Sequence, residues 1–256
     1  MGAAKTAAPP ARGSDAFKAA VKAELSDHRV PMVFRVGDLG DQYNPWVLSA
    51  KIPVSAQVRL FKSDWMEETL TKMPPWIVPV LYVPAMLHCC VQSIGPTFGP
   101  GMLLWWAFFI AGLATWAHIE YALHRFVFHW ATKNYWLNTL HFLLHGIHHL
   151  SPNDPERLVF PPVLAIPITL VIANSVRAYV GWSHGNAMVA GGIFGYMNYD
   201  MTHWFIHHRK PTSWLYSWLK RCHTHHHYRN HDVNFGISPA AKVLDFVFGT
   251  HVSPDW

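Results

Sequence analysis

The stretch GMLLWWAFFIAGLATWAHIEYALHRFVFH, residues 101–129, indicates the fold class, because an apolar run passes directly into a pair of histidines. Residues 101–123 contain one acidic side chain, Glu120, and neither Lys nor Arg. A helix needs about 20 largely apolar residues to cross a bilayer. The sequence therefore predicts a membrane-spanning helix that carries His124 and His129 at one end.

The composition favours a membrane protein that also has a sizeable polar part. Hydrophobic residues make up 51% of the 256 residues and charged residues 14%, whereas soluble proteins contain about 25% charged residues. The mean hydropathy of +0.09 is too low for a protein made of membrane helices alone. The three cysteines form no CxxC pattern and no disulfide framework. The net charge of +5 is concentrated beside apolar runs, so we expect a membrane and not nucleic acid as the partner.

Four apolar runs predict an all-α integral membrane protein with four transmembrane helices. These runs lie at about 74–95, 101–123, 159–182 and 187–206. Short uncharged links join the first pair and the second pair, whereas residues 51–73, 124–157 and 207–256 carry most of the Lys and Arg. By the positive-inside rule those basic segments face the cytoplasm, which gives two hairpins with both termini inside. The alternative is a soluble all-α protein with buried apolar helices.

The rest of the chain divides into three expected regions. Residues 1–30 are rich in Ala and Pro without a long apolar core, and are predicted to be a disordered tail; Gly2 and Thr6 also fit the loose pattern for N-myristoylation. Residues 31–73 are predicted to be a cytoplasmic or interfacial segment with a helix in KSDWMEETLTK. The membrane domain is expected over 74–256, with a His-rich helical cap over 124–157 and 203–250.

Nineteen histidines are the unusual feature of the composition, and eight of the ten in the histidine boxes follow a helical spacing. Residues three or four apart share one face of a helix, so the histidines of HGIHH, HWFIH and HTHHH converge within each segment. His124 and His129 are five apart, which predicts a helix end or a break. All ten fall in cytoplasmic segments or at the cytoplasmic ends of the predicted spans. The predicted ligands are His124, His129, His145, His148, His149, His203, His207, His223, His226 and His227.

Ten imidazoles exceed what one metal ion accepts, so we expect two ions with about five ligands each. Neutral imidazole suits iron, zinc, copper and nickel, whereas magnesium and calcium prefer oxygen. The absence of a thiolate set excludes a Cys-type structural zinc site. The isolated histidines are interpreted as surface or core residues; they are His28, His88, His118, His184 and His251.

The order of the histidine boxes, HxxxxH, HxxHH, HxxxH and HxxHH, resembles that of the integral-membrane fatty acid hydroxylase superfamily. The runs HGIHHLSPNDPERLVFPP, GYMNYDMTHWFIHH and HTHHHYRNHDVNFGIS resemble more closely the fatty acid 2-hydroxylases, which act on acyl chains of dihydroceramide and sphingolipids. The first of these runs is the most specific, because the histidine boxes alone are shared with sterol desaturases and methyl oxidases. The resemblance extends over roughly residues 35 to 250.

The resemblance implies O2-dependent hydroxylation of carbon 2 of a long acyl chain, in ceramide or a precursor. It implies that the ten histidines hold a dimetal centre, with iron expected for activity and zinc also accepted by the same ligands. The chain has no HPGG haem motif, so it resembles the shorter plant-type members, and a separate cytochrome b5 and its reductase are expected to supply electrons. The resemblance also implies a multi-pass protein of the endoplasmic reticulum membrane, with its metal site facing the cytoplasm.

Two further residues are predicted to be catalytic. Tyr196 and Asp200 lie one turn apart, on the helix face that also presents His203. Asp200 is placed to orient a ligand imidazole, and Tyr196 to contact the head of the substrate. Glu120 lies one turn before His124 and is a second candidate for orienting a ligand.

Two alternatives remain open from the sequence. One is a sister dimetal enzyme that oxidises a sterol or another lipid on the same scaffold. The other is a metal transporter, although transporters place their ligands near the bilayer midplane, whereas these histidines are expected at one face. The chain length of the substrate, its free or ceramide-linked form, and the oligomeric state are also left open.

Overall fold

The structure, a computed structural model, describes residues 10–49, 51–53, 56, 58–94 and 101–254. These residues form helices and connecting segments, and no strand occurs among them, which confirms the predicted all-α class. They divide into two compact units: unit 1 is Met1–Glu67 with Ala131–Ser151, and unit 2 is Glu68–Trp130 with Pro152–Trp256. The predicted link at 95–100 and the predicted myristoylation site at Gly2 lie outside the described residues.

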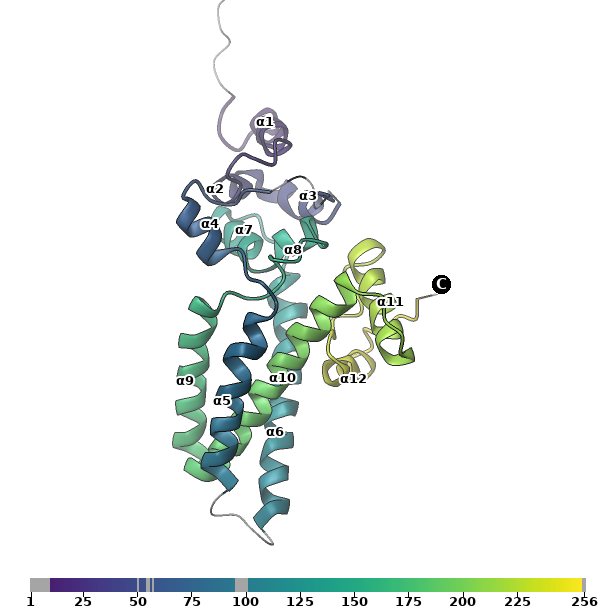
Figure 1. The fold of residues 1–256 in the computed structure, drawn as a ribbon. Helices are drawn as coiled ribbons and strands as arrows, with labels where there is room; N and C mark the ends of the chain where they lie inside the picture. Colours follow the sequence, from purple (N-terminus) through teal and green to yellow (C-terminus); the bar gives the residue numbers. More distant parts are fainter. Residues whose placement is uncertain (1–9, 50, 54–55, 57, 95–100, 255–256) are drawn as a thin grey trace, which may run out of the picture. The chain divides into compact units, whose positions relative to one another are not determined.

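Unit 1 is built from short helices that come from two separate stretches of the chain (Figure 1). A 3-10 helix, η1, and a π-helix, η4, continue the α-helices that precede them. Helix α4, Asp64–Leu70, begins in unit 1 and ends in unit 2, within the segment where the sequence predicts a helix. The other elements are α1 Asp15–Leu25, α2 Val33–Val36, η1 Gly37–Gln42, α3 Tyr43–Ser49, α7 Tyr135–His141, η4 Phe142–Gly146 and α8 Ile147–Leu150.

Helix α1 differs from the prediction of a disordered tail over residues 1–30. Its first turn is closed by the Ser14 hydroxyl, which accepts a hydrogen bond from the Phe17 amide at 3.2 Å, and such a cap stabilises a helix by about 1 kcal/mol. Val21 and Leu25 lie on one face and are buried. The two side chains lie on a helix that packs against α2 and η1, the next elements along the chain.

Hydrogen bonds join the two stretches of unit 1. The Tyr43 hydroxyl lies 2.6 Å from Nδ1 of His141, and the Asn138 side chain donates to the Gly40 carbonyl at 2.9 Å. The Ile52 amide donates to the Leu150 carbonyl at 2.8 Å. These contacts hold α7 and α8 against the N-terminal helices. His148 and His149 lie in α8, and His145 lies in η4, between α7 and α8.

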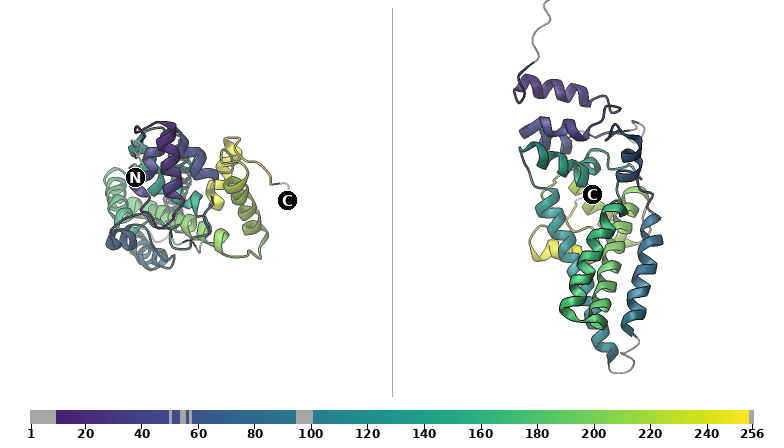
Figure 2. Two further views of the ribbon diagram at one scale, coloured as in Figure 1. Left: turned by 90° about the horizontal axis from the view of Figure 1, so that it is seen from above. Right: turned by 90° about the vertical axis from the view of Figure 1, so that its left-hand side faces the viewer.

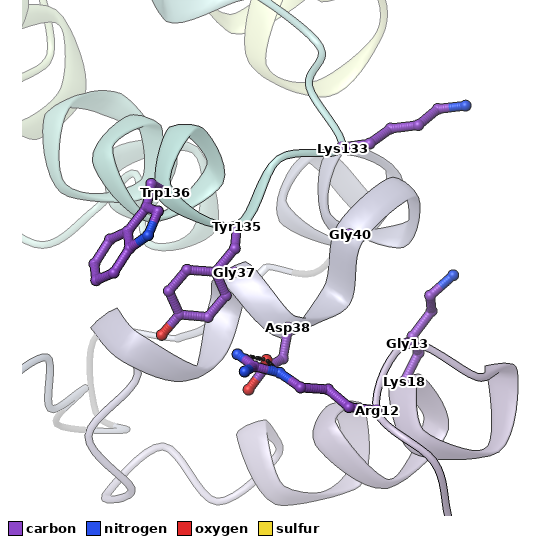
Figure 3. Close-up of a pocket in the computed structure, with 9 residues that line it drawn as sticks. All are labelled: Arg12, Gly13, Lys18, Gly37, Asp38, Gly40, Lys133, Tyr135 and Trp136. Atoms are coloured by element: carbon purple, nitrogen blue, oxygen red, sulfur yellow. Dashed lines mark hydrogen bonds and ion pairs between the residues drawn. The ribbon is translucent and has the colours of Figure 1, made fainter.

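Unit 1 also contains an open cavity of about 500 Å³ (Figure 3). Arg12 forms part of its wall, where its guanidinium donates to the Asp38 carboxylate at 2.7 Å and lies 5.2 Å from the centre of the Tyr135 ring. Lys18 and Lys133 extend away from this pair (Figure 3). None of its described lining residues is a histidine, so the cavity is separate from the predicted ligands.

The main part of unit 2 is a bundle in which helix α10, Trp182–His208, lies against α5, α6 and α9 (Figures 1 and 2). Within the described residues, three helical segments are long and apolar enough to cross a membrane: Ile77–Ile94, Gly101–Phe128 and Pro162–Val180. They correspond to α5, α6 with its extension η3, and α9. Leu103, Val91 and Val171 on these segments are 81%, 73% and 68% exposed. Apolar side chains on the outside of a bundle are expected where the surroundings are lipid.

Helix α10, which covers the fourth predicted span at 187–206, is not among these candidates. It carries the buried polar side chains Asn186, Asp200 and His203, and it occupies the interior of the bundle. A central helix that meets protein on most sides can hold polar groups that a lipid-facing helix cannot. The two-hairpin arrangement with a fourth span therefore stays a prediction.

Two short helices complete unit 2. Helix α11, Trp214–Tyr228, lies against α10, and helix α12, Pro239–Val247, lies against α6. The hydroxyls of Ser213 and Ser238 accept hydrogen bonds from the first-turn amides of these helices, as N-terminal caps do. The predicted histidine ligands of unit 2 lie in three places. They lie in or directly after η3, Leu123–Phe128, at the end of α10, and in α11.

Candidate metal centre

Four histidines converge where α10 ends and α11 runs beside it. His203 and His207 are one turn apart on α10, and His223 and His227 are one turn apart on α11. Nε2 of His223 lies 2.9 Å from Nε2 of His203, 2.8 Å from that of His207 and 3.0 Å from that of His227. The ligand nitrogens of this four-histidine group all lie within 4.8 Å of one another. Such a spacing allows one metal ion to bind all four.

Three other histidines of unit 2 form a second group. The rings of His124 and His226 are 4.7 Å apart, those of His129 and His226 are 4.5 Å apart, and those of His124 and His129 are 5.0 Å apart. Their ligand nitrogens also lie within 4.8 Å of one another. The two groups are neighbours, because the rings of His124 and His223 are 6.5 Å apart.

The local backbone explains how His124 and His129 meet although they are five residues apart. Residues Leu123–Phe128 form a π-helix, η3, that continues α6. A π-helix has hydrogen bonds from residue i to i+5 and is often found at functional sites, so a five-residue separation corresponds to about one turn. This confirms the predicted break and gives its form.

The three-histidine group contains two imidazoles whose protonated nitrogen is fixed by the backbone. Nδ1 of His124 lies 2.5 Å from the Phe235 carbonyl, and Nδ1 of His226 lies 2.8 Å from the Val233 carbonyl. A carbonyl oxygen only accepts, so Nδ1 carries the proton and the Nε2 lone pair is left for a metal. Burial holds the pKa of His226 well below its usual value of 6.5, which keeps this imidazole neutral at pH 7.

Unit 1 contributes a separate cluster of three buried histidines, His145, His148 and His149. Nε2 of His145 and Nε2 of His149 are 2.9 Å apart, whereas the ring of His148 is 5.5 Å and 5.9 Å from theirs. His145 lies in the π-helix η4 and the other two in α8. The helical spacing thus brings Nε2 of His145 and Nε2 of His149 into contact, and it leaves the His148 ring apart from this pair.

Tyr196 and Asp200 share one face of α10, as predicted from their spacing. Asp200 is 1% exposed, and within the described residues neither its Oδ2 nor the Tyr196 hydroxyl has a hydrogen-bond partner. The Tyr196 ring lies 4.8 Å from that of Tyr82 and 5.1 Å from that of Trp116. These buried polar groups are available to a ligand, and Asp200 makes no hydrogen bond to an imidazole in the described part of the chain.

Glu120 has a different role from the one its spacing suggested. Its carboxylate accepts hydrogen bonds from the Ile237 and Ser238 amides at 3.0 and 2.8 Å and from the Ser238 hydroxyl at 2.6 Å. It therefore holds the loop before α12, whose Phe235 carbonyl lies against His124. Asp154 and Arg157 form an ion pair at 3.1 Å.

Sequence reasoning missed the residues that hold the loop from Val233 to Ser238. Asp245 and Lys242 of α12 are buried beneath this loop and bond to it. Both residues follow the last histidine box, and Asp245 opens the run DFVFGT. Their spacing alone carries no signal for a metal site, because Asp245 acts on the loop through the Phe235 and Gly236 backbone amides and Lys242 acts through the Asn234 side chain.

Comparisons with known proteins agree with this geometry. Residues 109–250 match the model of the fatty acid hydroxylase family. The chain is 40% identical over 224 residues to dihydroceramide fatty acyl 2-hydroxylase FAH1 of Arabidopsis thaliana, covering 88% of this chain and 92% of the relative. It is 38% identical over 248 residues to fatty acid 2-hydroxylase of Homo sapiens, covering 89% of this chain and 64% of the relative.

A solved structure shares the fold. The structure described as full-length scs7p, with only the hydroxylase domain visible, superposes with a TM-score of 0.70 at 30% identity, covering 91% of this chain and 84% of that chain. The family match, the related sequences and the shared fold are therefore all consistent with a metal centre at the histidine groups of unit 2. The chain belongs to the fatty acid hydroxylase family, a family of enzymes.

Proposed function

We propose that this protein hydroxylates carbon 2 of long acyl chains, in ceramide or its precursors, at two metal ions held by the ten predicted histidines. The observation that carries the proposal is the presence in unit 2 of two adjacent imidazole groups, one of four and one of three, each with its ligand nitrogens within 4.8 Å. The names of the relatives support 2-hydroxylation of fatty acyl groups. Imidazole-only ligands fit iron or zinc.

The geometry within each unit suggests how the ten ligands divide. His145 and His149 have nearly touching Nε2 atoms, so they are expected to share one ion. An equal division then adds this pair to His124, His129 and His226, and adds His148 to the four-histidine group. Each ion would then be held by five imidazole ligands.

When bound, the two metal ions would supply activation of O2, chemistry that side chains alone cannot perform. The protein contributes neutral imidazoles, held with the correct nitrogen toward the ion by the Phe235 and Val233 carbonyls. Asp200 and Tyr196 offer a buried carboxyl oxygen, Oδ2, and a buried phenol hydroxyl that lie one turn apart on α10. We assign them to binding the polar group beside carbon 2 of the substrate and to holding a proton there.

The cellular setting is part of the proposal. Three helical segments that are long and apolar enough to cross a membrane support a location in a bilayer, and the histidine groups of unit 2 lie where α6 and α10 end. Carbon 2 of an acyl chain is close to the lipid head group, so a site near the membrane surface suits this reaction. We expect the endoplasmic reticulum membrane, a cytoplasmic metal site, and electrons from a separate cytochrome b5 and its reductase.

The test is reconstitution with defined components. Purified protein loaded with iron is supplied with O2, reduced cytochrome b5 and either ceramide or free fatty acid, and the lipids are analysed by mass spectrometry. We expect 2-hydroxylated product from wild type and none from His148→Ala, with exposed His118→Ala as the matched control. A wild-type protein with two ions per chain that oxidises sterol and leaves both acyl substrates unchanged would refute the proposed substrate.

A further inference from the structure

The loop from Val233 to Ser238 connects the last histidine box to α12 and contacts two predicted ligands directly. Its Phe235 and Val233 carbonyls accept from Nδ1 of His124 and His226 at 2.5 and 2.8 Å. Both imidazoles belong to the three-histidine group. The position of this loop therefore determines where two of the three Nε2 atoms of that group point.

Asp245 holds the loop from below. This fully buried carboxylate accepts from the Phe235 amide at 2.9 Å and from the Gly236 amide at 3.0 Å. Its remaining lone pairs accept from the Thr250 hydroxyl at 2.6 Å and the Lys242 ammonium at 2.8 Å. The peptide unit that presents the Phe235 carbonyl to His124 is thus fixed through its own Gly236 N–H and through the Phe235 N–H that precedes it.

Lys242 connects Asp245 to the start of the loop. Its ammonium is buried and also donates to Oδ1 of Asn234 at 2.8 Å. Asn234 adopts a left-handed backbone with φ of 59°, a conformation that asparagine tolerates better than most residues. Its amide donates to the Thr250 carbonyl at 2.8 Å, so this turn next to the Val233 carbonyl is held on both sides.

Glu120 holds the other end of the loop through the Ile237 and Ser238 amides. The loop is therefore held at one end by the Glu120 carboxylate on α6, one turn before His124, and further along by the Asp245 carboxylate on α12. Replacing a buried ion pair by apolar residues is often neutral or stabilising. The buried pair of Asp245 and Lys242 is therefore not explained well by stability alone. Holding the Phe235 carbonyl in place against His124 gives the pair a specific role.

We propose that Asp245, paired with Lys242, is a positioning residue for the ion bound by the three-histidine group and not for the ion bound by the four-histidine group. This inference rests on the proposed function, because it requires both ions. Loss of the carboxylate would release the Phe235 and Val233 carbonyls, and the imidazoles of His124 and His226 would turn or exchange their protonated nitrogen. Loss of such a partner of a metal-bound histidine lowers metal affinity about 10–100-fold.

The experiment compares Asp245→Asn with wild type in the full-length purified protein. Ions per chain are counted by elemental analysis, and the affinity of each site is measured by titration of the apoprotein with Co²⁺, followed by visible absorption. We expect two ions in wild type, and in the variant one site with unchanged affinity and one weakened about 10–100-fold. Equal weakening of both sites, or two sites of wild-type affinity, would overturn the inference.

A matched control separates positioning from the general cost of changing a buried carboxylate. Glu67 in unit 1 is also buried and accepts from the Leu60 and Phe61 amides at 2.9 and 2.8 Å. Glu67→Gln therefore changes a buried carboxylate that holds amides of a different loop, not those of the loop from Val233 to Ser238. We expect it to retain two sites of wild-type affinity, and selective loss of the same site would contradict the proposal.

A double variant keeps the test valid if Asp245→Asn folds poorly. Adding Lys242→Met removes the ammonium that would otherwise be buried without its counter-charge. We expect the double variant to regain thermal stability while one metal site stays weakened, because the loop amides still lack the carboxylate. Recovery of both sites together with stability would show that the pair acts only on folding. A wild-type protein that binds no metal would refute the proposed function itself, before any variant is compared.

Discussion

The contact between α6 and α10 yields a sharp prediction about Gly191. A Cβ atom added at Gly191 would lie 2.7 Å from the backbone carbon of Phe109 and closer still to its oxygen. A Cβ added at Gly112 would meet the Met188 backbone in the same way. Small residues at such positions allow helices in membranes to approach closely. Because the obstacles are backbone atoms, no side-chain rotation can relieve the overlap in Gly191→Ala.

Gly192 provides the control on the same helix. A Cβ there would lie 3.8 Å from the Gly112 oxygen, an ordinary van der Waals distance. Alanine in a helix is favoured over glycine by about 1 kcal/mol, so Gly192→Ala is expected to stabilise the protein slightly. At Gly191 the same gain is opposed by overpacking, which typically costs about 1–3 kcal/mol or more. The two neighbouring substitutions are therefore expected to have opposite signs.

The magnitude follows from the required displacement. Returning the Phe109 carbon from 2.7 Å to the 3.4 Å of an ordinary contact requires the two helices to separate. A change of 1 kcal/mol shifts the melting temperature of a chain of this size by about 2–4 °C. After the gain of about 1 kcal/mol from alanine is subtracted, the net cost of Gly191→Ala is up to about 2 kcal/mol, which lowers the melting temperature by up to about 8 °C. Gly192→Ala is expected to raise it by about 2–4 °C.

The same displacement is expected to reach the histidines. Helix α10 carries His203 and His207, and α6 continues to His124. A misplacement of about 1 Å at a site can cost about 100-fold in rate, so Gly191→Ala should lose activity as well as stability. The assays are thermal unfolding in detergent, followed by tryptophan fluorescence, and acyl hydroxylation at a temperature where both variants are folded. Equal melting temperatures for the two variants would refute the close-packing argument.

Three further predictions follow from the site. His223→Ala removes the imidazole whose Nε2 is within 3.0 Å of three others; elemental analysis should find one ion fewer per chain, and a retained second ion would count against that group. Asp200→Asn removes a buried charge that has no hydrogen bond at Oδ2; activity should fall with the melting temperature unchanged or raised, and a large loss of stability would point to a structural role. Glu120→Ala leaves buried loop amides without an acceptor and should lower the free energy of unfolding by about 1–3 kcal/mol. Glu120→Gln keeps an acceptor oxygen and should lower it less. Equal melting temperatures for the two variants would contradict the role of Glu120 in holding the loop.

Local sequence patterns were sufficient for the helices and for the histidines within each group. The apolar runs that became α5, α6 and α9 are recognisable because crossing a bilayer requires a minimum apolar length. His203 with His207, and His223 with His227, are predictable because a helix repeats every 3.6 residues. At His124 and His129, which are five residues apart, the sequence predicts a helix end or a break, but it does not reveal the π-helix.

Only the tertiary structure revealed which distant residues serve the histidines. The Phe235 carbonyl meets His124 across 111 residues, and Glu120 meets the same loop across 117 residues. Backbone carbonyls and amides are identical at every position, so no residue pattern indicates which of them a side chain will meet. Periodicity determines what lies on one helix face, whereas long-range packing determines what that face contacts.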